Sequence, residues 1–405
     1  MLELKKVAQY VTDKIDVALI NTPEYITTDN MMPNRGGVIE CESLPQASRV
    51  TKYAPGDTLV SNIRPYFKKI WYADRVSGCS NDVIVFRLID ESWNKKFLYY
   101  VLSQDAFFDH MMSGANGTKM PRGNKKIIPD FLVPDFDYEK QTRIAEVLSA
   151  YDSLIENNQK QIKLLEEAAQ RLYKEWFVDL HFPGYEDTPI VDGVPERWEK
   201  VPVGNLISYE IGGGWGEETP TGKCIREAYV IRGTDLYGIA HGDLLSIPFR
   251  YHVESNLSSR KLKDGDIVFE VSGGSRTEGV ARCLLITSSM LNVWRKDVMC
   301  ASFCKLIRPQ FGFSQYLHDC IKHLRATGKT EEYDKRSASS IVNYRWKDFL
   351  SQELVLRPSE EILDHYNGVA KEIYSKAINC SLQIESAKKA RDRLLPKLIS
   401  GEIEV

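Results

Sequence analysis

A heptad pattern of apolar residues runs from about Asp137 to about Asp179. Its members, spaced alternately four and three residues apart, are Ile144, Leu148, Tyr151, Ile155, Asn158, Ile162, Leu165, Ala169, Leu172 and Trp176. This spacing places every member on one face of a helix and is typical of a coiled coil. At 1.5 Å per residue such a helix spans roughly 60 Å, so we expect it to connect distant parts of the molecule. The polar Asn158 is expected to set register or partner at some cost in stability.

The same pattern returns later in the chain at a constant offset. Ile144 corresponds to Tyr366, and each later member of the first set has its counterpart at the same distance. The second set is Tyr366, Ala370, Ile373, Ala377, Cys380, Ile384, Ala387, Arg391, Leu394 and Leu398. Residues such as Ile162 and Ile384 are identical at this offset. The tripeptide at 130–132 also recurs at 348–350. Such self-similarity indicates an internal repeat, in which a module is followed by a helix and both are then duplicated.

The modules between the helices read as strand-dominated. Strands are predicted at 57–63, 69–73 and 81–89 before a helix at 94–112, and at 228–236, 266–273, 279–286 and 299–307 before a helix at 313–326. Each module also has a Gly-Asp turn that opens a strand, at Gly56-Asp57 and Gly265-Asp266. The predicted fold class is therefore α+β with an internal repeat. The predicted divisions are a first module at 1–136, a helix at 137–180, a linker at 181–196, a second module at 197–356, and a helix with a tail at 357–405.

Composition and charge restrict the class of protein. With 43% hydrophobic and 27% charged residues over 405 positions, the chain matches a globular protein of more than one domain. No stretch has the roughly 18 apolar residues of a membrane helix. The start lacks a signal-peptide pattern, so we expect a cytoplasmic protein with reduced cysteines and no membrane partner.

The net charge of −3 is unevenly distributed along the chain. Residues 1–136 hold 17 Lys and Arg against 16 Asp and Glu, and residues 197–356 hold 22 against 19. The intervening residues 137–196 hold 6 against 13. Two mildly basic modules separated by an acidic segment allow local electropositive faces.

Catalytic and metal motifs are missing or mismatched. An adenine methyltransferase requires an Asn/Asp-Pro-Pro-aromatic string, and the sequence has no Pro-Pro pair. The glycines at 212–216 do not fit a dinucleotide fingerprint, and Gly328-Lys329-Thr330 lacks the upstream glycine of a phosphate loop. Cys300, Ser302 and Cys304 alternate as along one strand, which favours buried thiols over a zinc site. Methyltransferase or nuclease activity within this chain is therefore disfavoured, and no metal is expected.

Several strings resemble the specificity (S) subunit of type I restriction-modification enzymes. They are VPERWEKVPVGNLISYEIGGGWGEETPTG at 194–222, YVIRGTDL at 229–236, DGDIVFEVSGGS at 264–275, GDTLVSNIRPYFKKIWYA at 56–73, GTKMPRGN at 117–124, PDFDYEKQTRIAEVLSAYDSLI at 134–155 and RDRLLPKLISGEI at 391–403. Together with the duplication, the resemblance covers essentially the whole chain. The opening of the first module, LELKKVAQYV, departs from the WEKVPVGNLI pattern of the second.

The resemblance implies two target-recognition domains, each reading one half of a bipartite, asymmetric duplex DNA site. The two long helices would pack antiparallel as a coiled-coil spacer with a pseudo-twofold repeat. It further implies docking to two methyltransferase subunits, which bind S-adenosylmethionine and methylate adenine at N6, and to motor or restriction subunits. The chain itself would be non-catalytic and bind no cofactor.

Basic, amide and hydroxyl side chains in turns mark the expected DNA contacts, since they suit phosphate binding and base readout. In the first module they are Asn62, Arg64, Tyr66, Lys68, Lys69, Thr118, Lys119, Arg122 and Lys125. In the second they are Arg232, Thr234, Ser272, Gly273, Gly274, Ser275, Arg276, Thr277, Lys329, Lys335 and Arg336. An ordinary charged surface is the competing interpretation.

The long helices have faces with more than one possible role. The apolar seams are expected to pack the two helices on each other, and the outer helix faces to dock partners. Trp176 and Phe177 could contact either a partner or a module. Because these patterns do not require a methylation partner, the second candidate function is a freestanding coiled-coil DNA-architectural protein.

Overall fold

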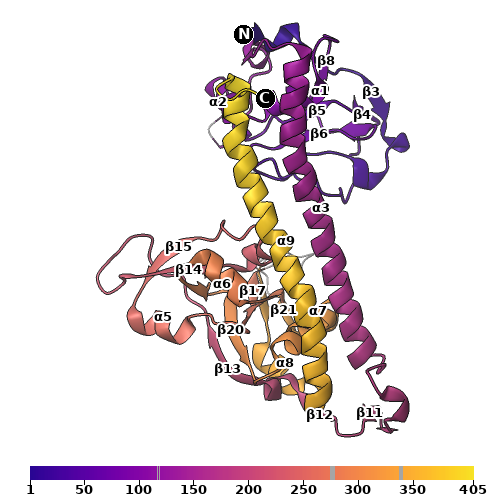
Figure 1. Ribbon diagram of the computed structural model, residues 1–405, viewed down its shortest axis with the longest axis vertical. Helices are drawn as coiled ribbons and strands as arrows, with labels where there is room; N and C mark the ends of the chain where they lie inside the picture. Colours follow the sequence, from indigo (N-terminus) through magenta and orange to yellow (C-terminus); the bar gives the residue numbers. More distant parts are fainter. Residues whose placement is uncertain (116, 118, 274–278, 337–340) are drawn as a thin grey trace. The chain divides into compact units, whose positions relative to one another are not determined.

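The computed structural model describes every residue except 116, 118, 274–278 and 337–340. The chain forms two compact units, one of residues Met1–Ser153 with Ala387–Val405 and one of residues Leu154–Ser386 (Figure 1). Two long helices, α3 (Tyr138–Phe177) and α9 (Glu360–Ser400), supply a stretch to each unit. They occupy the two stretches where the heptad pattern predicts helices.

The first unit is built on two antiparallel sheets, with strand orders β2-β8-β5-β6 and β3-β4-β7. Its strands are β1 (Leu2–Glu3), β2 (Ala8–Tyr10), β3 (Lys14–Asp16), β4 (Arg49–Tyr53), β5 (Thr58–Ser61), β6 (Ile70–Tyr72), β7 (Ser77–Cys79), β8 (Val83–Leu88) and β9 (Leu132–Val133). The three strands predicted here are confirmed as β5, β6 and β8. Their β-branched and aromatic residues suit a buried pleated surface.

The helix predicted at 94–112 is wrong in one respect, because the structure has two helices there. Helix α1 (Lys95–Leu102) is followed by α2 (Asp105–Ser113). The break lies at Ser103 and Gln104, where Gln104 is extended and the Ser103 hydroxyl donates to the Tyr99 carbonyl at 2.7 Å. Serine competes for backbone partners in this way, which favours a break over a continuous helix.

The C-terminal end of α9 completes the core of the first unit. Ile144 and Leu148 of α3 pack with Leu395, Leu398 and Ile399 of α9 in one apolar cluster with α1. This cluster joins residues from both ends of the chain, and both termini lie in this unit (Figure 1).

A buried polar network also ties these helices together. Arg391, only 9% exposed, forms an ion pair with Asp152 at 2.7 Å. The hydroxyl of Tyr100 donates to the same carboxylate at 2.5 Å. A largely buried charge needs such partners to offset its lost hydration.

The second unit has a four-stranded sheet of order β13-β20-β16-β18 and smaller sheets of order β15-β14-β19, β17-β22-β21 and β12-β23. Its strands are β10 (Ile190–Val191), β11 (Val194–Pro195), β12 (Glu199–Pro202), β13 (Ile207–Gly212), β14 (Arg226–Ile231), β15 (Phe249–His252), β16 (Ile267–Glu270), β17 (Ser272–Gly273), β18 (Cys283–Leu285), β19 (Asp297–Cys300), β20 (Cys304–Pro309), β21 (Asp334–Arg336), β22 (Val342–Tyr344) and β23 (Leu354–Arg357). Its shorter helices are α4 (Leu236–Ala240), α5 (Glu254–Arg260), α6 (Ser288–Trp294), α7 (Ser314–Ala326) and α8 (Trp346–Gln352). The predicted helix at 313–326 is confirmed as α7.

Three strand predictions in the second unit require correction. The strand at 266–273 is divided between β16 and β17, which belong to different sheets. The strand at 228–236 ends at Ile231, because the Asp235 carboxylate accepts from the Arg232 backbone N–H at 2.9 Å and starts a turn. The strand at 299–307 is two strands, because a turn closed by a hydrogen bond from Cys304 N to Ala301 O at 2.8 Å separates β19 from β20. Cys300, Ser302 and Cys304 therefore do not share one strand.

The cysteines themselves are buried as predicted. Cys300 and Cys304 are both 0% exposed, and burial raises the pKa of the Cys300 thiol to about 12. A thiol that resists ionisation is a poor metal ligand. Among the residues the structure describes, no group of three or more His, Cys, Asp or Glu could hold a metal ion.

The Gly-Asp turns of the two modules have the same local structure. Gly56 and Gly265 both have positive φ, at +90° and +83°, a conformation that favours glycine. In each module the antiparallel pair that follows is equivalent, β5 with β8 and β16 with β20. The divergent openings also match, because β1 pairs with β9 as β12 pairs with β23. The repeat thus extends through the fold where the sequences differ.

Helices α3 and α9 run antiparallel within each unit. In the second unit, Phe177 contacts Tyr366 with ring centroids 4.9 Å apart, and Gln161 lies 3.6 Å from the Cys380 thiol. In the first, Asp152 meets Arg391. Under the repeat offset, Ile144 and Leu148 correspond to Tyr366 and Ala370, which occupy the equivalent cluster of the second unit.

The last turns of the first seam differ from the prediction. Leu172 and Trp176 are half-buried, whereas Tyr173 and Phe177 are buried. A straight helix has 3.6 residues per turn, so its buried face drifts from a strict 3.5-residue repeat. Asn158 lies in the buried stripe, and its amide donates to the Leu154 carbonyl at 2.9 Å.

The remaining seam residues also differ in burial. Ile155, Ile162 and Ile384 are buried, as are Tyr366 and Leu398. Tyr151, Leu165, Ile373 and Leu394 are half-buried. The stripe is therefore mostly apolar and unevenly covered, with the polar Asn158 and Arg391 buried within it.

Candidate DNA-recognition surfaces

In the first unit, the structure brings two separate predicted segments together. The turn after β5 is joined to the segment 121–123 by hydrogen bonds from Arg64 N to Pro121 O at 2.8 Å and from Gly123 N to Asn62 O at 3.1 Å. An isolated bridge also pairs Ile63 with Arg122. The candidate residues at 62–69 and 119–125 thus belong to one local surface.

The turn itself has an unusual backbone. Arg64 and Lys68 both adopt positive φ, at 49° and 52°, on either side of a 3-10 turn at Pro65–Phe67. Non-glycine residues take this conformation rarely, and it often marks a constrained functional turn. Tyr66, 47% exposed, projects from it and contacts the Phe67 ring at 4.7 Å.

Three predicted contacts in this turn have partners inside the protein or lie buried. Lys69 donates to the Thr28 carbonyl at 2.6 Å, and burial lowers its pKa. Lys68 forms an ion pair with Asp105 at 2.9 Å. Asn62 is only 6% exposed. These side chains shape the turn, and we expect them to support rather than touch DNA.

The exposed cations of this surface lie on the second segment. Lys119, Arg122 and Lys125 are exposed, and Arg122 forms an ion pair with Asp82 at 3.2 Å. Thr118 lies outside the described residues.

In the second unit, a three-stranded sheet gathers the predicted residues. Ser272 and Gly273 in β17 pair with one side of β22, while Lys335 and Arg336 in β21 pair with its other side. Lys335 and Arg336 are exposed, and Arg336 lies 3.7 Å from Asp334. Gly274, Ser275, Arg276 and Thr277 lie outside the described residues.

Arg232 is held by its own turn. Its guanidinium donates to both oxygens of Asp235, at 2.9 and 2.6 Å, and this hydrogen bonding raises its pKa. Thr234 between them is exposed. Lys329 is also paired, with Glu332 at 2.8 Å. Thr234 is therefore the more accessible group of this turn.

Sequence reasoning missed a turn in the first unit, Thr27–Asn30, that is equivalent to the Arg232–Asp235 turn of the second. Thr27 N donates to the Asn30 side chain at 2.6 Å, as Arg232 N donates to Asp235. Ser80 N donates to Ile26 O at 2.8 Å, which matches Ala301 N and Ile231 O at 2.8 Å. The signal in the sequence is faint, because YITTDN at 25–30 aligns with VIRGTD at 230–235 without a gap but shares only the isoleucine, Ile26 with Ile231.

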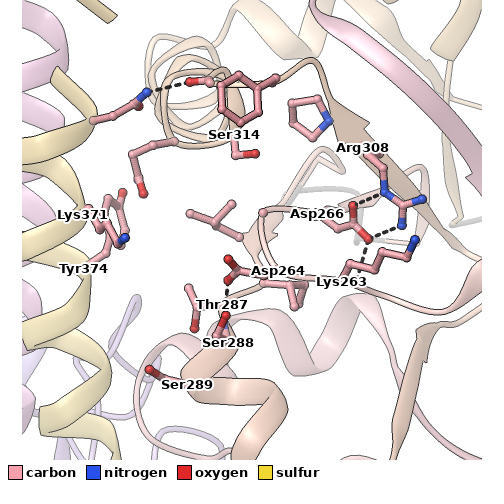
Figure 2. Close-up of a pocket in the computed structure, with 18 of the residues that line it drawn as sticks. Lys263, Asp264, Asp266, Thr287, Ser288, Ser289, Arg308, Ser314, Lys371 and Tyr374 are labelled. Atoms are coloured by element: carbon pink, nitrogen blue, oxygen red, sulfur yellow. Dashed lines mark hydrogen bonds and ion pairs between the residues drawn. The ribbon is translucent and has the colours of Figure 1, made fainter. Parts of the chain in front are cut away.

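A cavity of about 740 Å³ lies elsewhere in the second unit, beside α9 (Figure 2). Lys371 and Tyr374 of α9 line it, with Lys263 and Arg308 opposite. Asp266 engages Arg308 through two hydrogen bonds of 2.8 and 2.7 Å. None of its described lining residues belongs to the predicted DNA contacts.

Comparisons with known proteins agree with this architecture. Residues 9–167 match the family described as Type I restriction modification DNA specificity domain. The type I restriction enzyme MjaIX specificity subunit of Methanocaldococcus jannaschii is 27% identical over 335 residues, which cover 76% of this chain and 69% of that protein. The MjaVIII specificity subunit of the same organism is 30% identical over 118 residues, covering 29% of this chain and 27% of that protein.

A solved structure shares the fold. The crystal structure of a type I restriction-modification S subunit from M. genitalium superimposes with a TM-score of 0.52 at 13% identity, covering 98% of this chain and 95% of that one. A duplicated α+β protein with one candidate recognition surface in each module is the class of protein that the fold defines. Residues 9–167 thus match the type I restriction-modification specificity domain, and over most of its length the chain is similar to a type I restriction-modification specificity subunit. In the part of the chain that the structure describes, no helix is long and apolar enough to cross a membrane.

Proposed function

We propose that this chain recognises a bipartite, asymmetric duplex DNA site, one half-site per module. The observation that carries the proposal is the duplication of one surface turn on two modules with different side chains. The turn after β5 and the β17–β22 pair follow equivalent strands, but the first carries Arg64 and Arg122 where the second carries Gly273 and Asn343. Equivalent scaffolds with different surface chemistry suit two different half-sites.

The proposal includes a spacer role for the long helices. Antiparallel α3 and α9 would form a coiled-coil spacer that sets the distance between half-sites. Their exposed apolar residues, among them Leu154, Leu164 and Val369, provide an outer face for partners. The partners proposed are two methyltransferase subunits and possible motor or restriction subunits, with S-adenosylmethionine bound by the former. This chain would itself carry no catalytic step.

Single-molecule sequencing of genomic DNA tests the proposal. N6-methyladenine would be scored by sequence context in the source cell and in a strain deleted for this chain. We expect one split, asymmetric motif to lose methylation on deletion and to regain it on complementation. A methylation pattern that is unchanged by deletion, while the protein is expressed in the parent strain, would contradict the proposal.

A further inference from the structure

One exposed position in each module has the same backbone setting but a different side chain. It is occupied by Arg122 in the first module and by Asn343 in the second. Arg122 forms an antiparallel bridge with Ile63, and Asn343 pairs with Ser272 between β22 and β17. Each partner lies two residues beyond the end of the strand that the Gly-Asp turn opens, β5 or β16.

The hydrogen bond next to this position is also the same. Gly123 N donates to Asn62 O at 3.1 Å, and Tyr344 N donates to Val271 O at 2.9 Å. In each case the donor follows the exposed residue, and the acceptor precedes its bridge partner. The two segments are therefore paired in the same register.

A third segment is equivalent as well. Asn62 N donates to Asp82 O at 2.8 Å, and Val271 N donates to Phe303 O at 2.9 Å. Asp82 and Phe303 each lie just before a strand of the main sheet, β8 or β20. Three chain segments thus meet in the same way in both modules, and the correspondence does not depend on sequence identity.

The side chains at this position are exposed and oriented. Each lies between two buried neighbours along its segment, so it projects outward. The Arg122 side chain is 57% exposed, and Asp82 contacts its Nη2 atom. The Asn343 side-chain oxygen accepts from the Ser272 hydroxyl at 2.9 Å. In each case a neighbouring residue restrains the side chain at the surface.

These two residue types have defined preferences for base edges. Arginine can donate two hydrogen bonds to O6 and N7 of guanine, and asparagine can bond N6 and N7 of adenine in the major groove. We propose that Arg122 and Asn343 are equivalent base-reading positions, Arg122 reading a guanine in one half-site and Asn343 an adenine in the other. This inference rests on the proposed function and adds the residues and bases that would determine specificity.

The test uses the full chain with its modification partners in a cell, and methylated motifs as readout. Arg122→Ala should relax one guanine position of one half-site, and Asn343→Ala one adenine position of the other. Loss of one bidentate contact is expected to reduce discrimination at that position about ten- to a hundredfold. Asn343→Arg should change the preferred base at its position from adenine to guanine.

Two control variants remove similar side chains from elsewhere in the modules. Arg49 matches Arg122, since its side chain is 61% exposed and lies 3.2 Å from Asp16. Asn292 is an exposed asparagine in α6. Arg49→Ala and Asn292→Ala should leave the motif unchanged.

The outcomes separate the inference from the proposed function. A wild-type system that methylates a split motif, with both alanine variants methylating the same motif at the same level, would overturn the inference alone. A wild-type system that directs no such methylation would overturn the proposed function and the inference with it. If the alanine variants methylate nothing, Asn343→Arg decides: methylation at a motif with guanine supports the inference, and the original motif or none overturns it.

Discussion

At the residue scale, two buried aspartates explain why the Gly-Asp turn recurs. Asp57 is 2% exposed and accepts from Arg87 at 2.8 and 2.6 Å, and it also accepts from the Ala54 N–H at 2.8 Å. Asp266, 1% exposed, makes the same set with Arg308 and the Lys263 N–H. A bidentate arginine and a backbone donor together satisfy a carboxylate that is out of water.

Removing one of these carboxylates should therefore be costly. Asp57→Ala leaves Arg87 without its buried partner, and we expect a loss of about 3 kcal/mol in the free energy of unfolding. Asp13 provides the matched control, since it contacts the same Arg87 at 3.2 Å but its side chain is 65% exposed. Asp13→Ala should cost less than about 1 kcal/mol. Urea unfolding of both variants checks this, and equal losses would contradict it.

The readout positions also belong to the residue scale. The sequence marked the first-module turn because it is rich in Arg, Lys and Asn, but residue type alone could not show which of them are accessible. Lys69 points to a backbone carbonyl, and Asn62 is buried. Asn343 was missed because a single asparagine in a short strand has no distinguishing pattern.

At the element scale, a charged cluster holds the α4 turn against α3. Glu166 lies 3.4 Å from His241 and 3.2 Å from Lys322, and the His241 ring stacks on Tyr237. Burial alone would raise the pKa of Glu166, but the bond from His241 and the charge of Lys322 outweigh it and lower that pKa to about 2. Burial lowers the pKa of His241, while the hydrogen bond to Glu166 and the negative charge of Glu166 raise it. The resulting pKa of His241 is above the ordinary value of histidine.

These shifts predict a pH-dependent stability. A histidine with a raised pKa contributes stability that is fully present below about pH 6.5 and is lost as the pH rises through its folded-state value. Glu166 remains ionised throughout that range. Glu166→Gln should therefore lower the free energy of unfolding more at pH 6 than at pH 9, by about 1 kcal/mol. The melting temperature should fall more at pH 6 for the same reason.

The neighbouring Glu167 supplies the control for this experiment, because it is exposed on the same helix. Glu167→Gln should change the melting temperature little, and by the same amount at both pH values. An equal effect of Glu166→Gln at pH 6 and pH 9 would show that His241 does not titrate against it.

The long helices show how far an element can be predicted. The heptad spacing located both helices, because amphipathic periodicity depends only on residue order. It misassigned the last turns, where Tyr173 and Phe177 are buried beside Tyr316 and Tyr366. Which face of a helix end is buried depends on the module that packs there, and that information is not local.

At the scale of the whole molecule, both long helices run through residues of both units. The unit boundaries fall at Ser153 and Leu154 in α3 and at Ser386 and Ala387 in α9. A length change at these points leaves each unit's own contacts in place. The spacer role can therefore be tested without altering either recognition surface.

Insertion of one heptad at both boundaries should lengthen the preferred gap between half-sites. Seven residues add about 10.5 Å of helix, which corresponds to no more than about three base pairs at 3.4 Å each. Methylation-motif sequencing of the inserted variant measures the gap. An insertion in α3 alone should disrupt the pairing with α9 and reduce methylation. Methylation at the original gap with the double insertion would contradict a spacer that sets the distance.

The duplication of module and helix could be predicted from the sequence, because repeats, heptads and Gly-Asp turns are properties of residue order. The break between α1 and α2 was not, since it depends on the balance between local hydrogen bonds and tertiary packing. The equivalence of the two module openings was also hidden, because different residues can pair the same strands.

Residue order by itself thus determined the class of fold, the positions of both long helices and the family resemblance. Only the tertiary structure decided which candidate residues share a surface and which are already engaged. Arg122 and Asn343 became comparable once Ile63 and Ser272 were seen paired beside them. The physical reason is that periodicity and turn chemistry act between near neighbours, whereas exposure and pairing arise between segments distant in the chain.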